Sequence, residues 1–443
     1  MGVLVQISQF VLSLSIIVLL HEAGHFFAAR FFKIRVEKFY LFFDPWFSLF
    51  KYKKGDTEYG IGWLPLGGYV KISGMIDESM DKEQMKQPPQ PWEFRAKPGW
   101  QRLIVMVGGV TVNVILGFVI FTCLVYENGT SYLSMKNVRH GIYCDSLAAN
   151  VVGLKGTDTI LGVNGKAVTR FDSVTMDIIF DKAKSIQVER GGKVVSIPIS
   201  EEELAAILGD AKGFIDANIP FSVDSILPGK GADKAGLKKG DVITAITVPG
   251  DTVKTPYFQV FSATLQKYKN RDIQLTVNSQ GQIHPLNAHV DDDGIIGFKP
   301  KLDTSNMYVH TSYSFLQSIP MGIHNTFATI GSVAKQLNII FTVKGAHKQV
   351  GSFISITKSY SKVWDWGRFW AFTAFISVML AFINILPIPA LDGGHVMFLL
   401  YEMITGRKPN EKVMEYAQWA GMILLLTIMI YANGLDIGRL LHK

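Results

Sequence analysis

Cysteine is scarce in this chain of 443 residues, which contains only Cys123 and Cys144. Cys123 lies in a long apolar segment, whereas Cys144 lies in a polar region. Two separated cysteines cannot build a disulfide framework, and they are too few for a cluster of thiolate metal ligands. The sequence therefore excludes a disulfide-stapled fold and a cysteine-based metal cluster.

Charged residues other than Glu22 are missing from four long segments, residues 1–29, 103–126, 369–391 and 416–435. Each of these segments is long enough to cross about 30 Å of hydrocarbon. The first lacks the basic start and the cleavage pattern of a signal peptide, so we interpret it as a membrane span. We predict a polytopic α-helical membrane protein with about four transmembrane helices. Its helices are expected within residues 1–33, 103–126, 368–402 and 416–443.

Positive charge is concentrated between the apolar segments, and the net charge is +7. Lys and Arg cluster between the first and second segments and between the third and fourth. Because positively charged loops stay in the cytoplasm, we expect residues 34–102 and 403–415 to be cytoplasmic loops. Both termini and residues 127–368 then lie outside the cytoplasm. Since the charge flanks membrane spans, it does not indicate nucleic-acid binding.

The first apolar segment contains the sequence His21-Glu22-Ala23-Gly24-His25. On a helix, residues four apart share a face, so His21 and His25 can offer two nitrogens to one metal ion. Glu22 would border the same cleft without binding the ion. This arrangement suits Zn²⁺ with a nearby carboxylate as general base. A histidine pair near a helix end is the alternative, but ionisable groups inside membranes usually mark function.

The third apolar segment ends in irregular sequence that contains Pro387, Pro389 and Asp392. These prolines, and the two glycines after Asp392, cannot sit in an undisturbed helix. Irregular backbone at membrane depth is tolerated where it is buried in protein or lines a wet cavity. Alone, Asp392 could be a helix N-cap. Together with His21 and His25 it becomes a candidate third zinc ligand.

Residues 59–72 predict two short strands around a Pro/Gly turn, a hairpin at about 58–73. Gly60 and Gly62 alternate with bulky residues, so one face of the first strand is nearly bare and lets another backbone approach. An ordinary surface hairpin is the alternative. In the second apolar segment, Asn113 is expected to hydrogen-bond to a neighbouring helix in a structural role.

The polar region between the second and third spans contains one internal repeat. Residues 226–243 resemble the signature of a bacterial PDZ domain, and residues 146–158 form a more degenerate copy. We predict two PDZ-like α+β domains, at 127–210 and 211–303, that either bind peptide or only fill space above the membrane. Residues 304–367 are expected to lie on the membrane surface, because apolar residues recur there at helical spacing.

The motifs together resemble the site-2 protease family of intramembrane zinc metalloproteases. The HExxH sequence, Leu391-Asp392-Gly393 and the longer run Asn384-x-x-Pro387-x-Pro389 carry this resemblance. With PDZ-like domains between the second and third spans, the chain is similar to the branch that regulates sigma E. The resemblance covers essentially the whole chain.

The resemblance implies an intramembrane zinc metalloendopeptidase of the bacterial inner membrane. His21, His25 and Asp392 would hold zinc, and Glu22 would activate water. Asn384 would contact the substrate backbone, as would a membrane re-entrant β-hairpin. Its substrate-binding residues would be Gly60, Ile61, Gly62 and Trp63. The substrates would be membrane-spanning proteins such as a trimmed anti-sigma factor or remnant signal peptides, with the PDZ-like domains as a filter.

Two positions depart from the family pattern. Val110 stands where relatives often carry proline, and Met379 stands where relatives can carry a second asparagine, which affects substrate contacts there. Two other functions compete with proteolysis: a membrane-tethered PDZ scaffold with a vestigial zinc site, and a zinc-dependent transporter or sensor. The presence of Glu22 beside all three candidate ligands argues against both.

Overall fold

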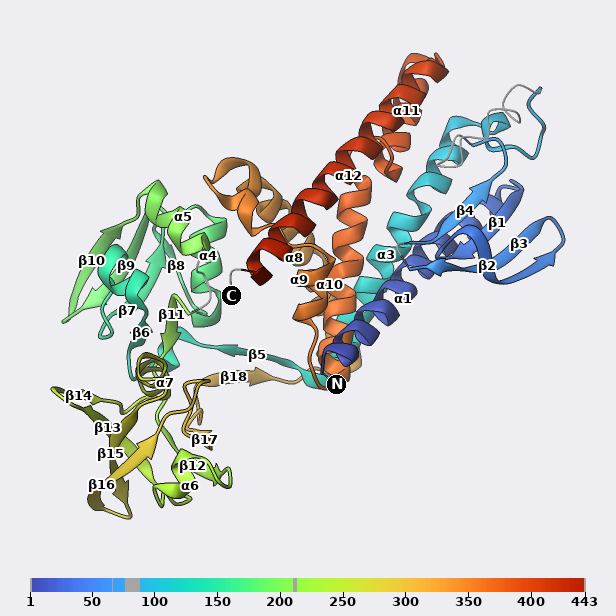
Figure 1. Cartoon of the computed structure of the whole chain (residues 1–443). Coiled ribbons are helices and arrows are strands. Elements are labelled where there is room, and N and C mark those ends of the chain that lie inside the picture. Colours follow the sequence, from blue (N-terminus) through green and yellow to red (C-terminus); the bar gives the residue numbers. More distant parts are fainter. Residues whose placement is uncertain (1, 66, 76–87, 210–212, 442–443) are drawn as a thin grey trace. The chain divides into compact units, whose positions relative to one another are not determined.

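The structure of the protein is a computed structural model that describes residues 2–65, 67–75, 88–209 and 213–441 (Figure 1). The chain divides into two compact units. The first unit comprises Met1–Gly129, Ser312–Ile340 and His347–Lys443, and the second comprises Thr130–Thr311 and Phe341–Ala346.

In the described part of the chain, four helices are long and apolar enough to cross a membrane. Each overlaps one of the predicted apolar segments, which confirms the expected membrane protein with helical spans. Helix α3 packs against both α1 and α10 (Figure 1). The four helices are α1 (Gly2–Phe31), α3 (Gly99–Asn128), α10 (Trp366–Ile385) and α12 (Glu411–Leu441).

The third predicted span is two helices rather than one. Helix α10 ends at Ile385, and α11 (Asp392–Thr405) begins after a six-residue connection. Pro387 and Pro389 cannot continue a helix, and Ala390 adopts a left-handed backbone conformation with φ of 75°. The break therefore places Asp392 at the first position of a new helix.

Helices α1 and α3 touch through their backbones. A Cβ atom on Gly24 would collide with the carbonyl oxygen of Gly108, and one on Gly108 would lie 2.7 Å from the carbonyl oxygen of Gly24. Because no side chain fits between them, glycine at both positions allows this approach, as is common between membrane helices.

Helix α12 is attached to the rest of its unit at two places. A Cβ atom on Gly421 would collide with the carbonyl oxygen of Pro389. Near the other end, the buried Asp436 carboxylate accepts hydrogen bonds from the backbone and hydroxyl of both Ser352 and Ser355 at 2.6–3.1 Å. Asp436 thereby ties α12 to the start of α9 (Phe353–Ser359).

The apolar stretch after the second unit forms helix α8 (Phe315–Thr342), as its helical spacing predicts. The hydroxyl of Thr122 on α3 occupies the space where a Cβ atom on Gly322 would stand. Several large apolar side chains of α8 are exposed, including those of Leu316 and Phe327. Whether the helix lies on a membrane surface remains a prediction.

A four-stranded sheet in the first unit follows α1, with strand order β2-β3-β1-β4. The two strands predicted within residues 59–72 are present as β3 and β4, but the hairpin pairing is wrong because β1 lies between them. The local hairpin joins β2 to β3 at Gly55, whose φ of 62° suits a tight turn. The strands are β1 (Val36–Leu41), β2 (Phe43–Lys54), β3 (Thr57–Leu64) and β4 (Tyr69–Ile72).

The second unit repeats one arrangement of strands, as the sequence predicts. The first copy has the order β10-β9-β7-β8 beside a pair β11-β6, and the second has β16-β15-β13-β14 beside a pair β12-β17. The same turn precedes β7 and β13: Asp158 accepts from the amide of Lys155, and Asp241 accepts from the amide of Lys238, both at 2.8 Å.

The elements of the first copy come in the chain order β6 (Ile142–Cys144), β7 (Thr159–Val163), β8 (Lys166–Ala167), α4 (Val174–Phe180), β9 (Ser185–Arg190), β10 (Lys193–Pro198), α5 (Glu201–Gly209) and β11 (Ile215–Ala217). Those of the second copy are β12 (Phe221–Ile226), α6 (Gly231–Lys234), β13 (Val242–Val248), β14 (Asp251–Lys254), α7 (Phe258–Lys267), β15 (Asp272–Ser279), β16 (Gln282–His289) and β17 (Phe298–Leu302).

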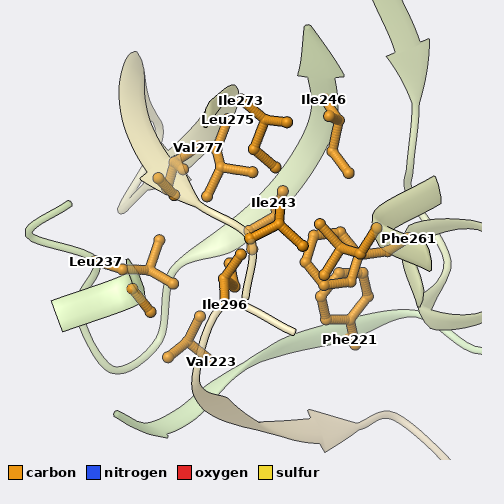
Figure 2. Close-up of a cluster of buried hydrophobic side chains, with 14 of the residues drawn as sticks. Phe221, Val223, Leu237, Ile243, Ile246, Phe261, Ile273, Leu275, Val277 and Ile296 are labelled. Atoms are coloured by element: carbon orange, nitrogen blue, oxygen red, sulfur yellow. The ribbon is translucent and has the colours of Figure 1, made fainter. Parts of the chain in front are cut away.

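The second copy has a well-packed hydrophobic core (Figure 2). The rings of Phe221 and Phe261 pack at a tilt of 41° with centroids 5.0 Å apart, and Ile243 and Leu275 are fully buried. Alternate residues of β15 supply part of the apolar face, as expected for a half-buried strand, whereas an irregularity between Ile243 and Ala245 interrupts the alternation in β13.

The chain enters and leaves the second unit through two paired strands. Strand β5 (Thr130–Leu133) is antiparallel to β18 (Tyr308–Thr311), with Thr130 opposite Thr311 (Figure 1). The first and last residues of the inserted segment are therefore neighbours.

Candidate metal centre

The two histidines of the HExxH sequence lie one turn apart on α1, and both are buried. Their rings meet edge to face, with centroids 4.9 Å apart. The two Nε2 atoms are 3.3 Å from each other. The helical spacing therefore turns both imidazoles toward one point, as the sequence predicts.

Asp392 completes a triangle with the two imidazoles. Its Oδ2 lies 3.3 Å from Nε2 of His21 and 3.3 Å from Nε2 of His25. Ligand atoms in a tetrahedral zinc site, each about 2.0–2.1 Å from the metal, are about 3.3–3.4 Å apart. The three atoms thus have the spacing of one face of a zinc tetrahedron, which leaves the fourth corner for water or substrate. Among the described residues, His21, His25 and Asp392 form the group of His, Cys, Asp or Glu side chains that could hold a metal ion.

Backbone and side-chain groups fix the orientation of both imidazoles. Nδ1 of His25 lies 2.8 Å from the carbonyl oxygen of Val105 on α3 and donates to it, which leaves Nε2 free for a metal. His21 contacts two carboxamides: Asn113 at Nδ1, at 3.2 Å, and Asn384 at Nε2, at 3.3 Å. Asn384 therefore lies beside the centre, on the last turn of α10.

Glu22 follows His21 directly on α1, one residue from a candidate ligand. Its side chain is packed against the turn before β4, where a Cβ atom on Gly68 would lie 3.4 Å from Cγ of Glu22. Glycine at position 68 therefore allows the turn to lie against α1, where a Cβ atom would come within 2.9 Å of Val18. This contact was not predicted, because the sequence indicates only that Gly68 belongs to a turn.

Gly109 makes room for the imidazoles. A Cβ atom at this position would collide with Nε2 of His25 and lie 2.6 Å from Cε1 of His21. The sequence indicates only close helix contact at Gly109, because nothing in the pattern identifies which atoms approach it. The structure shows that the approaching atoms are those of the candidate ligands.

The bare face of β3 is covered by other residues of the same sheet, and substrate binding by β3 stays a prediction. Gly60 accommodates the ring of Tyr40, and Gly62 accommodates the backbone of Phe43, where the chain crosses from β1 to β2. The backbones of Gly60 and Ile61 pair with β1 on one side and with β2 on the other. Pairing with β1 ends at Ile61, so only the residues after it have an open side toward β1.

Comparisons with known proteins agree with this geometry. The sequence model of peptidase family M50 matches residues 9–428. A protein named "putative zinc metalloprotease" from Neisseria meningitidis is 27% identical, over 98% of this chain and 98% of the relative. The regulator of sigma E protease of Haemophilus influenzae is 26% identical, over 99% of this chain and 100% of the relative. The chain therefore belongs to peptidase family M50, the site-2 protease family, and it is a membrane protein and a zinc metalloprotease.

Proposed function

We propose that this protease cleaves peptide bonds within the transmembrane segments of other membrane proteins. The supporting observation is the triangle of His21, His25 and Asp392, with edges of 3.3 Å, on helices that are apolar enough to cross a membrane. These three residues hold zinc, and Glu22 is the general base. A soluble substrate would not need a site built into such helices.

Each residue of the centre has a separate task. Bound zinc supplies a Lewis acid that polarises a carbonyl and acidifies a water molecule. Glu22 would accept a proton from the attacking water and deliver it to the leaving nitrogen. Asn384, with its carboxamide beside Nε2 of His21, donates to the substrate backbone. The connection after Ile385 frees backbone groups around Asp392 and thereby keeps a polar environment at this depth.

An unwound substrate segment needs new partners for its backbone, because unpaired polar groups cost several kcal/mol each in lipid. The open side of β3 at Gly62 and Trp63 offers them, close to the turn at Gly68 that touches Glu22. Strand β2 exposes large apolar side chains, including Trp46 at 91% and Leu49 at 66%. We therefore propose that this sheet enters the membrane beside the site.

The repeated second unit comprises two PDZ-like domains that act as a filter outside the cytoplasm. Its repeat topology and the resemblance of residues 226–243 to a PDZ signature support this assignment. The enzyme lies in a bacterial inner membrane with both termini outside. The name of the Haemophilus relative, regulator of sigma E protease, supports a regulatory role. We propose that the substrate is a membrane-spanning anti-sigma factor already trimmed outside, with remnant signal peptides as a second class.

Replacing Gly109 by alanine should empty the metal centre. The new methyl group occupies the position in front of Nε2 of His25, so zinc content should fall far below that of the wild type. Metal analysis of the purified protein measures this. Gly434→Ala is the matched control, because its Cβ atom meets nothing within 4 Å. Full zinc occupancy in Gly109→Ala would contradict the proposed site.

The proposed activity is tested with the purified protein in lipid vesicles. A peptide that spans the membrane should be cut inside its apolar segment, and a zinc chelator should abolish the cut until zinc is restored. Mass spectrometry of the products locates the cleaved bond. If cleavage is confined to segments outside the membrane, or if it persists in the chelator, the proposal fails.

A further inference from the structure

His21 is held between two carboxamides, one at each ring nitrogen. Nδ2 of Asn113 is 3.2 Å from Nδ1, and Nδ2 of Asn384 is 3.3 Å from Nε2. As placed, both amides present N–H groups to the same ring. A neutral imidazole has one N–H and one acceptor, so it cannot accept from both. One carboxamide must therefore present its oxygen.

The neighbouring atoms decide which carboxamide turns. Nε2 of His21 faces His25 and Asp392 at 3.3 Å, so Nε2 is the atom that would bind zinc. To bind zinc, Nε2 must carry its lone pair rather than a proton, and without the metal that lone pair can accept from the amide of Asn384. The ring proton consequently lies on Nδ1, and Nδ1 needs an acceptor. The oxygen and nitrogen of a carboxamide exchange places by a half-turn.

We propose that Asn113 is a positioning residue whose Oδ1 accepts the Nδ1 proton of His21 and so fixes the tautomer that binds zinc. This inference rests on the ligand set of the proposed function. Partners of this kind orient metal-binding histidines and raise their basicity. Val105 does the same for His25 through its carbonyl oxygen, at 2.8 Å. Each imidazole is thus held at Nδ1 by one residue of α3.

The burial of Asn113 makes its contact with His21 important, because no solvent reaches the carboxamide. Asn113 is fully buried, and its Oδ1 has no hydrogen-bond partner among the described residues. The half-turn gives that oxygen a donor and removes the contact between two N–H groups, although the amide nitrogen is then unpaired. The helices are also joined here independently of this side chain, because the hydroxyl of Ser377 donates to the backbone carbonyl of Asn113 at 2.9 Å.

The test compares the zinc affinity of purified metal-free variants by competition with a chromogenic chelator. Asn113→Leu keeps the volume but removes the acceptor, and its affinity should fall about 10–100-fold. Asn113→Asp keeps an acceptor, so its affinity should stay at or above the wild-type value. Ser377→Ala is the matched control, since it removes the hydrogen bond to the backbone of Asn113 and leaves His21 untouched. Its affinity should not change.

Wild-type affinity in Asn113→Leu would overturn the inference, and so would an equal loss in Asn113→Leu and Asn113→Asp. A role in helix packing alone predicts that equal loss. His21→Ala in the same assay tests the zinc ligand set separately from the role of Asn113. This variant should lose tight zinc binding. If His21→Ala still binds zinc tightly, the ligand set itself is wrong, and the role of Asn113 falls with it.

Discussion

Glu22→Gln is expected to keep its zinc and lose turnover by roughly 10²–10⁴-fold, the usual scale for losing a general acid–base group. Glutamine retains the size and shape of the side chain but cannot take a proton. Because Glu22 is not one of the three candidate zinc ligands, the zinc content of the variant should match that of the wild type. Turnover of a membrane peptide and metal analysis of the same preparation measure the two effects.

Asp392→Asn is expected to be equally inactive for a different reason. It replaces an anionic ligand by a neutral one at the third corner of the triangle, so zinc affinity itself should fall. The two variants should therefore look alike in activity and differ in metal content. Substantial turnover by Glu22→Gln, or normal zinc and activity in Asp392→Asn, would refute the assigned roles.

Excision of residues 130–311, the inserted part of the second unit, should let the protease cut substrates that still carry a bulky outer domain. Thr130 and Thr311 are opposite each other on β5 and β18, so a short linker can join residue 129 to residue 312. The shortened protein should cut trimmed and untrimmed forms of one substrate at similar rates, whereas the full chain should cut only the trimmed form. The ratio of the two rates measures the filter.

Metal content and chelator-sensitive cutting of the trimmed form establish that the shortened protein is folded. In that background, Glu22→Gln should abolish both reactions, which ties the new activity to the same site. A folded shortened protein that still rejects the untrimmed substrate would refute a filter made of the PDZ-like domains.

The metal centre could be predicted because its signals are local. His21 and His25 share a helix face by spacing alone. The prolines before Asp392 break the helix, and a broken helix is tolerated at membrane depth only where its backbone is buried in protein or lines a wet cavity. The membrane spans could likewise be predicted from apolar runs, and the repeat could be predicted from a recurring turn. Each of these signals lies within a short stretch of sequence and needs no knowledge of distant partners.

Features that depend on distant partners could not be predicted. An alternating pattern specifies which face of a strand is buried but not which strand lies beside it, so nothing placed β1 between β3 and β4. Gly62 indicates a close approach, yet the pattern does not identify the approaching group, which is the chain's own crossing at Phe43. Likewise, Asn113 indicates a contact between helices, but only the structure identifies the imidazole of His21.

Gly421 has a consequence for how related sequences are read. It lies on α12, which carries none of the assigned site residues, yet it touches the carbonyl oxygen of Pro389, three residues before Asp392. Any larger residue there would displace the connection that holds this carboxylate. A homologue that retains every signature motif but carries a larger residue at this position is therefore expected to be inactive. The residue at position 421, together with the signature motifs, should therefore distinguish active proteases from inactive relatives.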